Sequence, residues 1–152
     1  FNPNNIAIHG IEKEDVKFAP PFPLFYETLA ENLNGNKIVH HTAFDRIALD
    51  KACDKYGLPH LDVEWIDSSE IVRQALPQFA EVGYGLKNVA NYFGYHFKHH
   101  DALNDALATA FITIQCDEIL KKKKSSPKCV FFVTLFRRFY LILLLSFRSQ
   151  LT

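Results

Sequence analysis

The sequence lacks methionine, has few cysteines and has no excess of charge of either sign. Its 152 residues contain no methionine and only three cysteines, Cys53, Cys116 and Cys129, which are widely separated. This odd number and wide spacing argue against a disulfide framework or a cysteine-based zinc site, and favour a reducing, cytoplasmic compartment. The 17 basic and 17 acidic residues cancel. Any contact with a polyanion must therefore come from a local patch rather than from an overall field.

Neither end of the chain carries a clear signal peptide or membrane span. No basic-then-apolar leader follows Phe1, so we expect no signal peptide. Because the chain has no methionine and begins with Phe1, we interpret it as a piece of a longer product. Near the other end, an apolar run over residues 129–147 is interrupted by Arg137 and Arg138. A membrane span needs about 20 apolar residues, and each arginine at its centre costs about 2.5–3.5 kcal/mol. A full span is therefore not favoured.

The composition indicates one globular domain followed by a different kind of segment. Hydrophobic residues make up 48% of the chain and charged residues 22%, which is typical of a folded protein. The composition changes at the lysine run that begins at Lys121. We therefore predict a domain over residues 1–120 and a lysine-rich linker with a hydrophobic tail over residues 121–152. That tail is either a non-native extension or a weak membrane anchor.

Apolar spacing and breaker residues predict an α/β domain with few strands. Residues 1–23 are rich in proline and asparagine and are predicted to be loop, with a short helical turn near Glu12–Val16. Two strands are predicted, Lys37–His40 and Val63–Ile66, which are too few for a stable sheet. The predicted helices are Phe25–Leu33, a helix capped by Thr42 that runs to Tyr56, Glu70–Leu76 capped by Asp67–Ser69, Leu86–Phe93, and Asp101 to about Leu120.

A histidine and a carboxylate lie five residues apart at the start of the longest predicted helix. A carboxylate on a helix face that is otherwise apolar is costly unless it is paired or bound to a metal, which draws attention to Asp105. His100 supplies a group that exchanges a proton near neutral pH. The pair indicates metal-assisted hydrolysis. A zinc site made of His96, His99, His100 and Asp101 is a weaker alternative, because the spacing is irregular and no cysteine lies nearby.

Three segments, in the same order and spacing, resemble the DEDDh 3′–5′ exonucleases, the family of the epsilon proofreading subunit of bacterial DNA polymerase III. They are Ile8–Ile11, Val39–Asp45 and His100–Asp105. Connecting residues also match the family, among them Tyr56–Pro59 and Ile66–Ser68. The resemblance covers about residues 1–120. It implies a ribonuclease H-like α/β exonuclease fold.

The resemblance also implies site residues, cofactors and partners. Asp45 and Asp105 correspond to metal-binding aspartates and His100 to the general base. His9, His40, His41 and Phe44 correspond to positions near the substrate or the metal site. The family uses two divalent ions, Mg²⁺ or Mn²⁺, to release nucleoside monophosphates from the 3′ end of DNA or RNA. A polymerase or a homodimer partner is a further implication.

Two departures from the family pattern qualify this hypothesis. The Asp-x-Glu of the family's first strand is absent, so we expect the N-terminal strands to be missing and the chain alone to be inactive or nearly so. His41 stands where the family commonly has asparagine. Two alternatives remain open, a catalytically dead nucleic-acid-binding or interaction module and a membrane-anchored protein that uses residues 129–147. Without the matching segments, Asp45 would be an ordinary helix residue, His40 a strand residue and His9 a turn residue.

Overall fold

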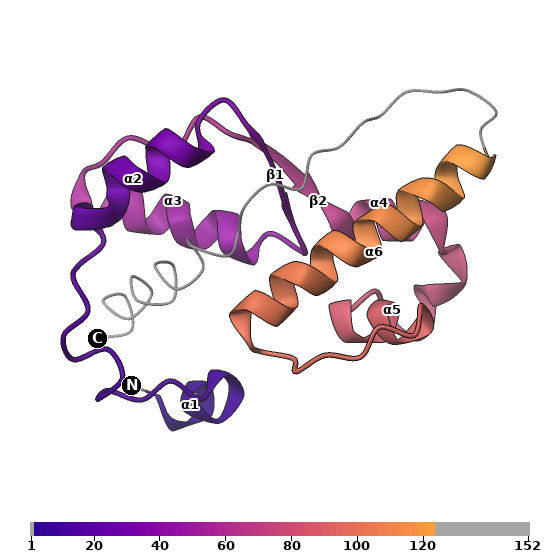
Figure 1. The fold of residues 1–152 in the computed structure, drawn as a ribbon, viewed down its shortest axis with the longest axis horizontal. Coiled ribbons are helices and arrows are strands. Elements are labelled where there is room, and N and C mark those ends of the chain that lie inside the picture. The colour runs from indigo at the N-terminus through magenta and orange to yellow at the C-terminus, as the bar shows by residue number, and fades with distance from the viewer. Residues whose placement is uncertain (1, 124–152) are drawn as a thin grey trace.

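The computed structural model describes residues 2–123, which form helices around a small sheet (Figure 1). The side chains of Asn5 and Lys123 are outside this description. In chain order the elements are α1 (Pro3–His9), α2 (Pro23–Leu33), β1 (Lys37–His40), α3 (Phe44–Tyr56), β2 (Glu64–Asp67), α4 (Ser68–Ala75), the 3-10 helix η1 (Pro77–Ala80), α5 (Leu86–Tyr92) and α6 (Ala102–Lys123).

The sheet positions the candidate site. Its strands β1 and β2 are parallel, with Lys37 opposite Glu64 and His40 opposite Asp67. Parallel neighbours require a crossover connection, and α3 provides it. The predicted α/β class is confirmed, and a small parallel sheet among helices fits a ribonuclease H-like fold. In residues 2–123 the sheet has two strands, as the sequence predicts.

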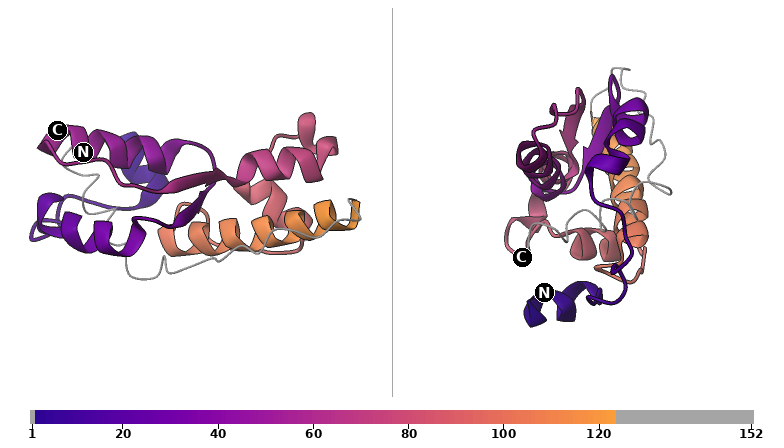
Figure 2. Two further views of the ribbon diagram at one scale, coloured as in Figure 1. Left: turned by 90° about the horizontal axis from the view of Figure 1, so that it is seen from above. Right: turned by 90° about the vertical axis from the view of Figure 1, so that its left-hand side faces the viewer.

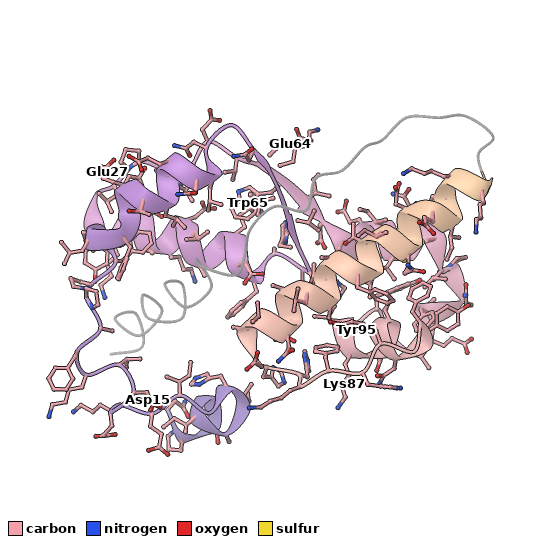
Figure 3. All side chains as sticks on the ribbon, viewed as in Figure 1. Asp15, Glu27, Glu64, Trp65, Lys87 and Tyr95 are labelled. Atoms are coloured by element: carbon pink, nitrogen blue, oxygen red, sulfur yellow. The ribbon has the colours of Figure 1, made fainter. Side chains whose placement is uncertain are left out.

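The first hydrophobic core lies between α2, α3 and the sheet, in the left half of Figure 1. Phe22, Leu29 and Cys53 are fully buried there. Trp65 of β2 packs against this cluster, and Figure 3 shows it beside the strands. Because the apolar residues of α2 and α3 recur at helical spacing, both helices turn one face toward this core.

The second core joins α4, η1, α5 and α6. Val72, Val89, Ala108 and Ile112 are completely buried in it. The long helix α6 packs against α4 and α5 and also reaches β1. It runs diagonally across the half of the molecule that contains α4 and α5 (Figure 1). Through these contacts α6 joins the second core to the sheet.

The prediction of loop over residues 1–23 is wrong in part, because α1 lies within it. The Asn2 side chain accepts a hydrogen bond from the Asn4 N–H at 2.9 Å, and Pro3 occupies the first helical position. Gly10 ends the helix with a φ of 70°, a left-handed conformation that glycine adopts without strain. The expected helical turn near Glu12 is a turn over residues 13–18.

Three further predictions concern the cap of α3, the linker and the hydrophobic tail, and each has its own outcome. Thr42 is not the cap of α3: its φ is 69°, and the helix begins after Ala43, whose side chain makes no capping bond. The first three lysines of the predicted linker, Lys121–Lys123, belong to α6, and the rest of that segment lies outside the described residues. The tail of residues 129–147 lies outside the described residues. Within residues 2–123, every helix is too short or too polar to cross a membrane.

Candidate functional site

The candidate site lies at the carboxyl ends of the two parallel strands. The loop His41–Ala43 follows β1 and leads into α3, whose first turn carries Asp45. Asp67 ends β2 and begins α4. Asp105 stands in the first turn of α6. The carboxyl edge of a parallel sheet is where loops converge and ligands bind in open α/β folds.

Asp45 and Asp105, which are distant in sequence, are electrostatic neighbours. Burial raises the pKa of the Asp45 carboxyl above its ordinary value; the charge of His40 opposes this rise and the negative charge of Asp105 adds to it. Both carboxylates are half-buried. Two carboxylates that share a desolvated site repel each other, and a bound cation relieves both the repulsion and the desolvation. The pair therefore fits a divalent cation.

Two adjacent histidines, His99 and His100, lie beside Asp105. The Nδ1 of His99 lies 2.8 Å from the Oδ1 of Asp105. The rings of His99 and His100 stack with centroids 3.9 Å apart and planes at 29°. One ligand atom from each of these three residues lies within 4.8 Å of the others. His100 has a φ of 65°, an uncommon left-handed backbone that recurs at functional sites.

The predicted zinc site of His96, His99, His100 and Asp101 is wrong in two of its ligands, because His96 and Asp101 do not belong to the group that the structure brings together. The His96 Nδ1 lies 3.0 Å from the side-chain oxygen of Asn91. Asp101 accepts hydrogen bonds from the backbone and side-chain nitrogens of Asn104, so it caps α6. Among the described residues, the one group of three or more histidine, cysteine or acidic side chains that could hold a metal is His99, His100 and Asp105.

His40 and His41 are held by hydrogen bonds inside the site. His40 is buried, its Nδ1–H donates to the carbonyl of Thr42, and its ring meets Trp65 edge-on. The Nε2–H of His41 donates to the carbonyl of Tyr84 at 2.9 Å, and its Nδ1 lies 2.9 Å from the hydroxyl of Ser68. Burial lowers the pKa of His41 despite the Tyr84 bond. His41 therefore joins three segments through these two contacts.

Asp67 fixes the loop that leads into the first turn of α3, where Asp45 lies, a role that the sequence does not reveal. Its Oδ1 accepts the N–H of Thr42 at 3.0 Å and the N–H of Ser69 at 2.8 Å. Burial disfavours the charged form, but hydrogen bonds from Ser69 and Thr42 outweigh it and hold the pKa of Asp67 below its usual value. The adjacent Ser68 hydroxyl donates to the His40 carbonyl at 2.9 Å.

Phe44 and His9 lie at the margins of the site. Phe44 is 67% exposed at the start of α3, next to Asp45. His9 ends α1, and its Nδ1 accepts the N–H of Ile11 at 3.0 Å. Within residues 2–123, no hydrogen bond or ion pair joins His9 to Asp45 or Asp105. Helix α1 stands apart from the sheet in Figure 1 and in the right-hand view of Figure 2.

Comparisons with known proteins give one match. The family model described as exonuclease, RNase T, matches residues 1–113, a span that includes Asp45, His100 and Asp105. Neither the curated proteins nor the solved structures contain a match to the chain.

Proposed function

The chain belongs to the exonuclease family of the RNase T type, and from this premise we propose that its site is that of a nuclease acting at the 3′ end of nucleic acid, and that it needs further carboxylates for full activity. Asp45 and Asp105 are the metal-binding carboxylates in this proposal, and His100 is the general base. The substrate is DNA or RNA, and the products are nucleoside monophosphates.

The electrostatic coupling of Asp45 and Asp105 carries this proposal. Both carboxylates are half-buried and offer hard oxygen ligands, and burial together with the charge of Asp105 raises the pKa of Asp45. Such ligands suit Mg²⁺ or Mn²⁺, with waters completing the coordination shell. When bound, a pair of divalent ions lowers the pKa of water and stabilises the leaving oxygen of a phosphodiester.

The surrounding residues have separate tasks. His100 is exposed beside Asp105, so its imidazole can take the proton of an attacking water at neutral pH. Asp67 and His41 hold the loop in front of Asp45 through hydrogen bonds to Thr42, Ser68 and Tyr84. Fixing a metal ligand in place in this way avoids an entropic cost during the reaction.

The same site supports the expectation that the chain alone has little activity. Its described residues bring two carboxylates together, whereas the family pattern uses four, and Asp105 is already paired with His99. These observations also favour the second candidate function, a nucleic-acid-binding module without catalysis. The two candidates differ in whether additional carboxylates produce cleavage.

Oligonucleotides labelled at either end test the proposal. We expect the 152-residue chain to release no nucleotide with Mg²⁺. A version extended at its N-terminus by a strand with Asp-x-Glu should release the 3′ label first, as a mononucleotide. Asp105→Asn should abolish this release, whereas Asp101→Asn should preserve it because asparagine also caps helices well. If the extended chain binds single strands but cleaves none, the binding module is correct. Mg²⁺-dependent cleavage by the unextended chain, lost in Asp105→Asn, would refute the expected inactivity.

A further inference from the structure

His99 is the residue of the site that neither the resemblance nor the proposed mechanism uses. Its Nδ1 contacts Asp105 at 2.8 Å, and its ring is stacked on His100. The edge of Phe97 packs against the same ring, with centroids 5.7 Å apart. His99 is therefore held between an aromatic ring, a second imidazole and a carboxylate.

An ordinary surface ion pair does not account for this arrangement. The side chains of His99 and Asp105 are 31% and 20% exposed, and ion pairs that solvent reaches contribute little to stability. The left-handed backbone of His100 is strained, which so weak a pair does not offset. A cation bound by both rings and by the Asp105 carboxylate would account for the arrangement.

We propose that His99, His100 and Asp105 form a site for a transition-metal ion of the Zn²⁺, Co²⁺ or Ni²⁺ type. Imidazole nitrogens suit these ions, whereas Mg²⁺ strongly prefers oxygen. Two histidines and one carboxylate also form a common three-ligand set that leaves room for water.

The geometry requires a small adjustment. Ligand bonds of about 2.0–2.1 Å place neighbouring tetrahedral ligands about 3.3 Å apart. The three ligand atoms now lie within 4.8 Å of one another. Because His100 is exposed, its side chain can rotate to close this difference, while His99 and Asp105 are already in contact.

The new site and the proposed nuclease site share Asp105 and His100, so they exclude each other. With Mg²⁺ bound by Asp45 and Asp105, the His100 imidazole stays available for proton transfer. With a transition-metal ion on His99, His100 and Asp105, the lone pair of His100 is occupied. The ion would then inhibit the nuclease. Only this consequence rests on the proposed function, because the binding site itself rests on geometry.

Titration of the full chain with Co²⁺ tests the site without a nuclease assay. We expect visible absorption bands from Co²⁺ bound by nitrogen and oxygen, without the near-ultraviolet charge-transfer band of a thiolate ligand. His99→Ala and His100→Ala should each weaken Co²⁺ binding by at least about tenfold, since loss of even an outer-sphere partner costs 10–100-fold. His96→Ala is the matched control, because His96 is a neighbouring exposed histidine outside the group, and it should bind as the parent does.

A parallel Mg²⁺ titration sharpens the test. His99→Ala removes the partner of Asp105, so it should bind Mg²⁺ at least as tightly as the parent while losing Co²⁺ affinity. The proposal is overturned if His99→Ala keeps the parent's Co²⁺ affinity, if His96→Ala loses as much, or if a thiolate band dominates. Absence of nuclease activity would leave these results unaffected, so the two proposals fail separately.

Discussion

Replacing Asp67 with alanine removes two hydrogen bonds that a single carboxylate oxygen holds. One comes from the Ser69 N–H at the start of α4 and the other from the Thr42 N–H in the loop before Asp45. Loss of a helix cap costs about 1 kcal/mol, and loss of a hydrogen bond to a charged group costs about 1.5–3 kcal/mol. Asp67→Ala should therefore lower the unfolding free energy by about 2–4 kcal/mol.

Urea unfolding followed by circular dichroism measures this loss. With a slope of about 1–3 kcal/mol per molar urea, the midpoint should fall by about 1–2 M. Asp67→Asn keeps an oxygen acceptor and should lose much less than the alanine variant. Glu70→Ala is the matched control, because it removes an exposed carboxylate from the same first turn, worth about 0.3–1 kcal/mol through the helix dipole. If Asp67→Ala costs no more than Glu70→Ala, Asp67 does not hold the loop.

Three further predictions concern stability and reactivity. Burial lowers the pKa of His41 in the folded protein. The contribution of His41 to the unfolding free energy is therefore complete above its unfolded pKa of about 6.5 and is lost as pH falls toward the folded pKa. Unfolding curves at successive pH values should show this loss of stability, and His41→Asn should make the pH dependence flatter. Ile112→Ala should lower the unfolding free energy by about 2–5 kcal/mol, because the Ile112 side chain is 0% exposed. Ile114 is 47% exposed, so Ile114→Ala should change the unfolding free energy by no more than about 0.5 kcal/mol. Thermal unfolding measures both variants. Burial raises the pKa of Cys116 from 9.0 to about 11, which lowers its thiolate fraction about 100-fold; mass spectrometry should therefore find Cys116 alkylated in urea but not in the native protein, and equal alkylation in both would contradict its burial.

The elements predicted well from sequence depend on local signals. Helix α6 has a long run of helix formers and a capping aspartate, Asp101, so its start is predicted within one residue. The strands β1 and β2 are short β-rich segments between breakers, and both exist within one residue of their predicted bounds. Helix α1 is not predicted, because its asparagines and proline are typical of loops. Its two caps, Asn2 and Gly10, are nevertheless present in the sequence.

The site is only partly predictable because its supporting contacts are tertiary. The segments that contain Asp45 and Asp105 can be found by pattern, but the bond between Thr42 and Asp67 joins residues 25 positions apart. No local rule predicts a positive φ at Thr42, a β-branched residue. The contact of His99 with Asp105 likewise accompanies a left-handed backbone at His100, which no local rule predicts. The sequence predicts that Asp67 caps α4, but its second hydrogen bond, from the Thr42 N–H, is evident only in the structure.

The central claim is that Asp45 and Asp105 jointly bind a divalent cation. A Mg²⁺ titration of the chain, followed by carbon-13 NMR of the side-chain carboxyl groups, tests it most directly. We expect the resonances of Asp45 and Asp105 to shift together, and Asp45→Asn and Asp105→Asn each to weaken binding by at least about tenfold. Asp101→Asn, which removes the same charge from the same end of α6, should bind as the parent does. Equal weakening by Asp101→Asn, or unchanged binding by Asp105→Asn, would contradict the account.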